Sequence, residues 1–287
     1  MADTLGQADI RGENIDKIVT GFALQSFKLK QVCMLQNSTN WKESFFQETA
    51  SELTVTDSGT GFSVKGVPRL AGFPNLNPSW TKASSYHIKH AGEATISLED
   101  VKTSEFDVMA RTLLRVGRAI AFSVDNAIYD VITADASTNT VAAADTWDSA
   151  TVANRDPVGD ILTAIKLCSI DNYDVLENGY LLVAPLAFSN LMRNASVIKH
   201  PTFVSGIMQN GRRGNLLGLT ILESNSIDAD EACVMKGQEA VTYKTAEALT
   251  TRTIEEPGIK WTIRAWEIGI TMVKNPEAIC IITNTDL

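Results

Sequence analysis

The chain has 287 residues, of which 44% are hydrophobic and 21% charged, a balance typical of a folded globular protein. Its net charge of −9 argues against a surface that condenses nucleic acid, because neutralising phosphates requires clustered lysine and arginine. There is no charged-then-apolar leader at Met1 and no run of about eighteen uncharged apolar residues, so we expect a soluble chain made in the cytoplasm.

Residues 1 to about 30 are polar and are expected to form an N-terminal arm. Acidic and basic side chains are balanced in its first thirty residues, so the arm is not a basic tail. Apolar residues at Ile15, Ile18 and Phe22 have helical spacing and predict a short helix. Such a helix is too small to bury itself, so we expect it to fray or to dock on another surface.

Residues 41–98 are expected to form a long, extended β-hairpin. Short alternating segments with β-branched and aromatic residues predict its strands, at 53–56, 62–64, 86–88 and 94–98. Glycine and proline between Gly66 and Trp80 cannot continue a sheet and predict an irregular tip. A two-stranded ribbon is marginally stable in water, so the hairpin needs either its own domain or a foreign surface to pack on. The tip residues that would make such contacts are Pro68, Leu70, Phe73, Pro74, Leu76 and Trp80.

The most regular segment is a predicted helix from Ser104 to Ala134. Its apolar residues recur every three or four positions and form one continuous stripe, comprising Phe106, Met109, Leu113, Val116, Ile120, Val124, Ile128 and Val131. Ser104 is a candidate N-cap, and Asp107 can pair with Arg111 one turn later. At a rise of 1.5 Å per residue this helix would be about 45 Å long, which makes it a spine for the fold.

A compact α/β unit is predicted over residues 155–235. Asp156 and Pro157 supply an N-cap and a first-turn proline for a helix that reaches Cys168. A buried strand at 180–184 then leads into a second helix from Pro185, and strand alternating with helix is typical of α/β folds.

The last forty residues are predicted to be strands. Pro257 and Gly258 fit the central positions of a type II turn that joins a strand over 241–254 to one from Ile259. The apolar residues of the second strand move from odd to even positions near Ala265 and Trp266, which predicts a bulge or a sharp twist there. A turn at Asn275 and Pro276 precedes a final strand over 278–282.

Candidate chemistry is sparse. Asp57-Ser-Gly-Thr resembles the turn of an aspartic protease, but that mechanism needs two carboxylates, and a hairpin turn explains the single copy as well. The glycine-rich segment 210–218 lacks the Gly-Lys-Ser/Thr of a phosphate-binding loop. The histidines and cysteines have no metal-ligand spacing, and we expect the cysteines to be buried free thiols. We therefore predict no catalytic, cofactor-binding or metal site, and a protein that is not an enzyme. The histidines are His87, His90 and His200, and the cysteines are Cys33, Cys168, Cys233 and Cys280.

The order of these elements resembles the major capsid proteins of tailed bacteriophages with the Hong Kong 97 type fold, an α+β fold. Five segments carry the resemblance: Gly92–Leu98 before the spine helix, Ala119–Ala121 with Asp125 inside it, Leu182–Pro185, Gly214–Ile221, and Val273–Ile279. The resemblance implies an N-terminal arm (1–40), an extended loop (41–98), a peripheral domain with the spine helix (99–154 and 236–287) and an axial domain (155–235).

The resemblance also implies a function. Members assemble as pentamers and hexamers into an icosahedral head that encloses double-stranded DNA without reading its sequence, and the arm and loop lie across neighbouring subunits. By this resemblance, Ile15, Ile18 and Phe22 and the tip residues are candidate inter-subunit contacts. We expect a separate scaffolding protein and a portal as partners, no membrane, assembly in the host cytoplasm and a final place in the virion. Lysines 65, 82 and 89 lie in the loop, but no crosslink is predicted. The alternatives are an encapsulin-type cellular shell and an aspartic protease using Asp57.

Overall fold

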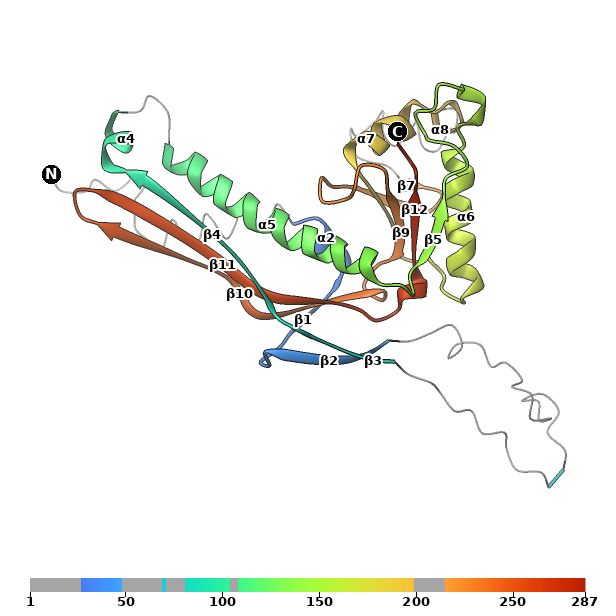
Figure 1. Ribbon diagram of the computed structural model, residues 1–287, viewed down its shortest axis with the longest axis horizontal. Helices are drawn as coiled ribbons and strands as arrows, with labels where there is room; N and C mark the ends of the chain where they lie inside the picture. Colours follow the sequence, from blue (N-terminus) through green and yellow to red (C-terminus); the bar gives the residue numbers. More distant parts are fainter. Residues whose placement is uncertain (1–26, 48–68, 71–80, 104–107, 199–214, 287) are drawn as a thin grey trace.

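The computed structural model describes residues 27–47, 69–70, 81–103, 108–198 and 215–286. A four-stranded sheet runs along the length of the molecule (Figure 1). Its strand order is β1-β10-β11-β4, with β1 parallel to β10 and the other neighbours antiparallel. These strands are β1 (Met34–Asn37), β10 (Val241–Glu256), β11 (Lys260–Val273) and β4 (Ile88–Ser97).

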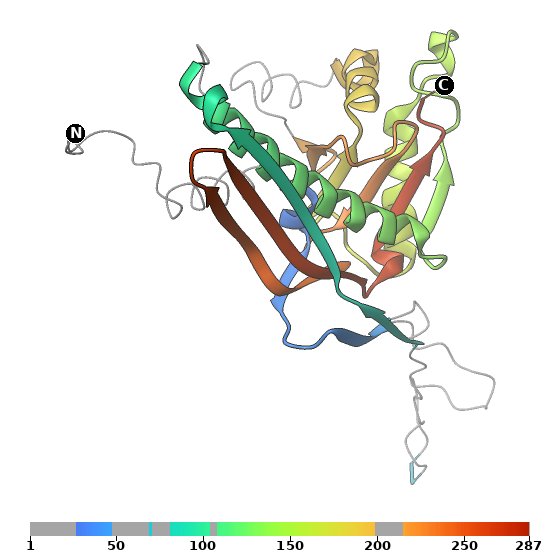
Figure 2. The ribbon, with the colours of Figure 1, turned by 60° about the vertical axis from the view of Figure 1, so that its left-hand side comes forward.

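The predicted spine helix is confirmed as α5 (Val108–Ala134), although its expected start at Ser104 lies outside the described residues. It packs on β4 and β11, and in Figures 1 and 2 it runs across β4 along the length of the sheet. The contact face is apolar, with Leu113, Val116 and Ile120 at most 6% exposed. Each of these side chains stabilises the fold by about 1.5–3 kcal/mol, so this interface holds the helix rigidly to the sheet.

A six-stranded sheet of order β5-β12-β9-β6-β8-β7 forms the compact end of the molecule. Helix α6 (Pro157–Ile170) packs on β12, β5 and β9, and its predicted cap is confirmed because the side chain of Asp156 accepts the N–H of Gly159 at 3.0 Å. The strands are β5 (Asn139–Ala142), β12 (Ile279–Thr283), β9 (Ala232–Lys236), β6 (Gly179–Val183), β8 (Leu219–Glu223) and β7 (Asn215–Leu216). The other helices of the described residues are α2 (Leu29–Val32), α4 (Leu98–Thr103), α7 (Pro185–Arg193), α8 (Ala195–Ile198) and the 3₁₀ turns η1 (Val152–Asn154) and η2 (Pro276–Ala278).

The hairpin is shorter than predicted in the part that the structure describes. Strand β2 (Lys42–Gln47) pairs with β3 (Thr81–Tyr86). We had expected residues 94–98 to continue this hairpin, but they do not. Residues 94–97 belong to β4, which pairs with β11 over ten consecutive residue pairs, and Leu98 begins α4. The alternating pattern of 94–98 gave the correct element and the wrong partner, because periodicity identifies a strand but not the strand beside it.

The terminal strands also differ from expectation. Strands β5 and β12 lie side by side in the six-stranded sheet, and β12 also pairs with β9. The predicted turn between β10 and β11 is confirmed, with Gly258 at φ 79°. An irregularity does lie near Trp266, because the register of the β10–β11 pair shifts between Glu247/Ile268 and Thr250/Trp266. The extra residue is in β10, however, and β11 keeps its register with β4. The apolar phase changes for another reason: from residue 267 to 273 both faces of β11 are buried.

All four cysteines are buried and free, as predicted. Burial raises the pKa of the Cys33 thiol to about 12, so this group stays protonated and unreactive near neutral pH. Among the described residues no helix has the length and apolarity needed to cross a membrane.

Candidate functional site

The first candidate site is the point where the N-terminal segment joins the body of the protein. Here the short helix α2 (Leu29–Val32) packs on the spine helix α5. The buried carboxylate of Asp125 accepts the backbone N–H groups of Lys28, at 2.8 Å, and Lys30, at 3.1 Å. Burial raises the pKa of Asp125, and the backbone hydrogen bonds oppose that rise. A side chain of the spine thus caps the first turn of α2.

Lys30 also connects the start of α2 to the four-stranded sheet. Its ammonium group forms an ion pair with Glu267 of β11, whose side chain is fully buried. The hydroxyl of Tyr243 donates to the same Glu267 oxygen at 3.1 Å, and burial raises the Tyr243 pKa. Lys30 also lies 4.5 Å and 4.9 Å from the ring centres of Phe27 and Tyr243. We call Lys30, Asp125, Tyr243 and Glu267 the root anchor; it fixes where the N-terminal segment leaves the body.

His90 lies beside this anchor. It is opposite Glu267 in the β4–β11 ladder, and its Nδ1 is 2.9 Å from the hydroxyl oxygen of Ser123 on α5. Burial lowers the pKa of His90, and the negative charge of Glu267 opposes part of that decrease. The imidazole is therefore neutral near pH 7 and joins the sheet to the spine.

A second candidate site surrounds the base of the β2–β3 hairpin. Glu43 of β2 accepts a hydrogen bond from the Ser38 hydroxyl and forms an ion pair with Lys244 of β10 at 2.9 Å. The Ser38 hydrogen bond is the largest cause that lowers the pKa of Glu43, followed by Lys244. These contacts fix the direction in which the hairpin leaves the sheet (Figure 1).

Large apolar side chains are exposed next to this ion pair. We call them the hairpin-base surface: Trp41 is 68% exposed, Phe46 53%, Tyr86 66% and Ile88 51%. They come from β2, β3, β4 and the residue before β2, and Tyr86 lies opposite Lys42 in the β2–β3 ladder. Large apolar side chains left exposed together on one part of a protein are costly in water and typically mark an interaction surface.

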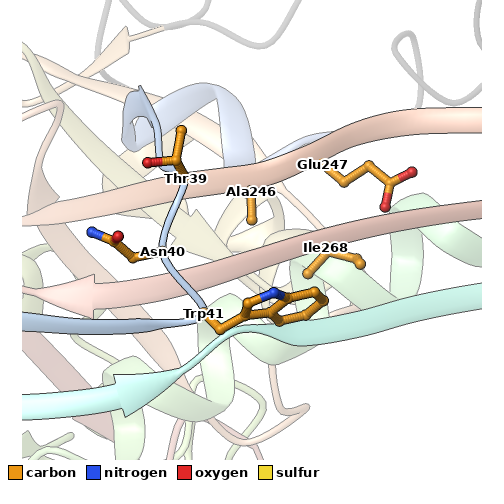
Figure 3. Close-up of a pocket in the computed structure, with 6 residues that line it drawn as sticks. All are labelled: Thr39, Asn40, Trp41, Ala246, Glu247 and Ile268. Atoms are coloured by element: carbon orange, nitrogen blue, oxygen red, sulfur yellow. The ribbon is translucent and has the colours of Figure 1, made fainter.

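A shallow depression of about 290 Å³ adjoins Trp41. Figure 3 shows its lining, in which Trp41 lies next to Ile268 of β11 while Ala246 and Glu247 come from β10. Thr39 and Asn40 complete it. The indole N–H of Trp266 donates to Glu247 at 2.8 Å and orients this carboxylate. The lining suits a docked side chain of a protein better than catalysis, since Glu247 is the one ionisable group among its described residues.

The structure leaves most of the predicted contact residues untested. Of the tip residues only Leu70 is described, and it is fully exposed with φ 66°. The rest lie outside the described residues: Pro68, Phe73, Pro74, Leu76, Trp80, Ile15, Ile18 and Phe22, and so does Asp57 of the protease alternative. In the part of the chain that the structure covers, no group of three or more histidine, cysteine or acidic side chains is placed to hold a metal ion.

Sequence reasoning missed the root anchor and the hairpin-base surface. A signal for the anchor was present, because Asp125 and Glu267 are charged residues inside apolar segments, and such residues are buried only when paired. Tyr86 and Ile88 were predicted to lie in a strand, but nothing in their spacing says that both side chains are exposed.

A family comparison decides which proteins share this arrangement. The sequence profile of the phage capsid protein family matches residues 83–282, which is more than half of the chain. The chain belongs to the phage capsid protein family. The family match makes it a capsid structural protein, and the resemblance to major capsid proteins of tailed phages is confirmed.

Solved structures give the same fold. The virus-like particle from Pyrococcus furiosus matches with a TM-score of 0.65 and 11% identity, covering 94% of this chain and 98% of that one. The capsid of cyanophage P-SCSP1u matches at 0.63 and 14%, covering 91% and 90%. The mature capsid of bacteriophage PhiM1 matches at 0.59 and 15%, covering 91% and 88%. A search of curated protein sequences gave no significant match. This capsid protein therefore has the Hong Kong 97 type fold, with mixed helices and strands.

Proposed function

We propose that this capsid protein is the self-assembling shell subunit of a tailed phage, forming pentamers and hexamers of an icosahedral head that encloses double-stranded DNA. The family match over residues 83–282 carries the proposal. Similarity to chains from assembled particles, including the cyanophage capsid, supports it. The net charge of −9 is compatible with a shell that a motor fills, since such a shell need not attract DNA.

The proposal gives each part of the chain a role. The arm (1–40) and the extended loop (41–98) reach neighbouring subunits, while the peripheral (99–154 and 236–287) and axial (155–235) domains form the shell itself. Contacts come from Ile15, Ile18 and Phe22 of the arm and from the tip residues listed above. Partners are other copies of the chain, a separate scaffolding protein and a portal; the protein assembles in the host cytoplasm and ends in the virion.

The hairpin-base surface supports this assignment physically. Trp41 and Tyr86 are about two-thirds exposed, although the hairpin itself is held firmly by the Glu43–Lys244 ion pair. A rigid hairpin with uncovered apolar side chains is suited to contact a second subunit. The hairpin is part of the extended loop (41–98), so the hairpin base and the rest of the loop would bind one neighbour together.

A deletion of residues 66–80 tests the proposal. The deletion variant should remain folded and soluble, because this segment is a poor candidate for the subunit's own core, but it should form no stable shells. Sedimentation velocity and negative-stain microscopy measure assembly, and circular dichroism measures folding. A variant that still forms closed shells, or one that unfolds, would contradict the proposed role of the loop.

A cellular nanocompartment shell of the encapsulin type is the second candidate. The likeness to the Pyrococcus furiosus virus-like particle, at a TM-score of 0.65, favours it. The contents of native particles separate the two candidates, since a phage head holds DNA and a nanocompartment holds a cargo protein.

A further inference from the structure

The depression beside Trp41 suits a positively charged side chain. Its volume is about 290 Å³, and Trp41 and Ile268 give it an apolar wall (Figure 3). Glu247 is the one ionisable group among its described lining residues, so the charge there is negative. A long cationic side chain can lay its methylene groups on the apolar wall and bring its charge to the carboxylate. Arginine suits this arrangement best, because its planar guanidinium also stacks on an indole ring.

Glu247 is available for such a side chain. The indole N–H of Trp266 donates to its Oε1 atom at 2.8 Å, which holds the carboxylate in place. Within the described part of the chain Glu247 forms no ion pair. Lys89 lies over the ring of Trp266, 5.8 Å from its centre, rather than on the carboxylate. An incoming cation can therefore bind Glu247 without displacing a partner.

The described part of the loop tip carries the matching pair of side chains. Arg69 and Leu70 form a turn, and both are exposed. Leu70 has φ 66°, in the left-handed region that leucine adopts at a cost and glycine at none. A strained residue that holds a large apolar side chain in water is typical of a contact site. A cation beside an uncovered leucine is the complement of a carboxylate beside an uncovered tryptophan.

The direction of the hairpin separates the tip from the depression of its own subunit. Trp41 precedes β2, whereas the loop leaves the hairpin at the other end, where Gln47 pairs with Thr81. The six residues of β2 set these two points about 20 Å apart. The ion pair between Glu43 and Lys244 holds the base of the hairpin to the sheet, so the loop starts in a direction away from the depression. A second copy is therefore the better source of the tip.

A turn also fits the depression better than the other surfaces that combine a cation with an exposed apolar side chain. On the spine helix, for example, Arg118 lies one turn before Phe122, which is 49% exposed. A helix about 10 Å wide cannot enter a hollow of this size, whereas a turn presents two adjacent side chains on a narrow projection.

We propose that the depression beside Trp41 receives the loop tip of a second copy of the chain, with Arg69 of that copy at Glu247 and its Leu70 on Trp41 and Ile268. The tip and the depression are different surfaces, so each subunit gives its tip to one neighbour and receives a tip from another. Contacts of this kind close into rings when the rotation permits. The rest of the hairpin-base surface stays free for the neighbour that receives the subunit's own tip. The inference rests on the proposed function, because it requires copies that assemble.

A double-mutant cycle tests the charge contact. E247Q removes the charge but keeps an oxygen that accepts the Trp266 indole N–H, so the fold should be undisturbed. E247Q and R69Q should each raise the subunit concentration needed for shell assembly about twofold to fivefold, as measured by sedimentation. R69Q/E247Q should do no worse than either single variant, because the second substitution removes nothing further. R252Q and R118Q each remove an exposed cation elsewhere and should assemble like the wild type.

The variant L70G tests the apolar contact. Glycine adopts the left-handed conformation of Leu70 at no cost, so a defect can be assigned to the lost side chain and not to the backbone. The concentration needed for assembly should rise about tenfold, while the circular dichroism spectrum of the subunit stays that of the wild type. Normal assembly of L70G would remove this leucine from the contact.

Crosslinking tests the chain of origin. A tagged L70C subunit and an untagged A246C subunit, mixed before assembly and treated with a short bismaleimide, should give a crosslinked dimer that carries the tag. The native cysteines are buried and should not react. N225C, at an exposed site outside the depression, should give no such dimer with L70C. Crosslinking of L70C/A246C within one chain would overturn docking on a second copy.

The controls separate failure of this inference from failure of the proposed function. If the wild type forms shells while E247Q and R69Q assemble equally well, or if their effects multiply in the double variant, the inference is wrong and the proposed function stands. A defect in R118Q equal to that in R69Q would also overturn it, since the depression would not select the tip. A wild-type protein that forms neither shells nor crosslinked dimers would overturn both together.

Discussion

Replacing Lys30 by methionine should destabilise the subunit through the charge that it leaves behind. The Lys30 side chain is 14% exposed and its partner Glu267 is fully buried, so the K30M variant retains a buried carboxylate whose only remaining bond in the root anchor is to the Tyr243 hydroxyl. Removing one partner of a buried ion pair typically costs about 3–5 kcal/mol. We expect a loss near the lower end, about 3 kcal/mol, because water reaches part of Lys30.

The double variant K30M/E267Q separates the lost ion pair from lost packing. With both charges gone, no unpaired carboxylate remains buried, so the loss should shrink to about 1–2 kcal/mol. Urea unfolding of the unassembled subunit, followed by circular dichroism, measures these free energies. K260M is the matched control: Lys260 pairs with Glu256 at 3.5 Å, but their side chains are 39% and 48% exposed, so this variant should lose less than about 1 kcal/mol.

Two results would refute this reasoning. One is a K30M variant whose free energy of unfolding matches that of K260M. The other is a double variant whose loss equals the sum of the K30M and E267Q losses, since additivity would mean that the two side chains do not interact.

Three further predictions follow from burial and backbone geometry. Burial lowers the pKa of His90 below its ordinary value of 6.5, so the stabilising contribution of the neutral imidazole is complete above that value and is lost as the pH falls through the lowered pKa. The urea midpoint of the wild type should therefore drop between about pH 7.5 and pH 5.5, and it should drop less in H90Q. Equal drops in the two proteins would contradict the assignment. W41S should leave the thermal unfolding midpoint within a few degrees of the wild type but reduce the yield of shells in sedimentation, and a normal yield would exclude Trp41 from the interface. G179A should not yield folded protein, because an added Cβ would lie 1.8 Å from the Val175 carbonyl oxygen. G258A has open space around the added Cβ but φ 79°, so it should fold with a free energy of unfolding lower by about 1 kcal/mol. Similar thermal midpoints for the two variants would show that the close approach at Gly179 is not needed.

Local signals in the sequence were sufficient to predict most elements. Three of these predictions are confirmed, and each depends on residues close together in the chain: the apolar stripe of α5, the Asp156–Pro157 start of α6 and the Pro257–Gly258 turn. Such signals express helix periodicity, capping and turn geometry, which do not require knowledge of the tertiary fold.

Partner choice could not be predicted in the same way. Strand β4 pairs with β11 and β12 pairs with β9 and β5, and these pairings join residues far apart in the sequence. The root anchor has the same character, since Lys30 meets Asp125 and Glu267 only in the folded chain. A buried charge in an apolar segment signals that a partner exists without saying which one.

Electron cryomicroscopy of native particles containing this protein tests the central claim most directly. The account predicts closed icosahedral shells built from pentamers and hexamers of this chain, with DNA inside and with the extended loop of each subunit lying on its neighbour. Particles in which the chain is a minor component, or a protein that remains a compact monomer under every condition that assembles related capsids, would contradict it.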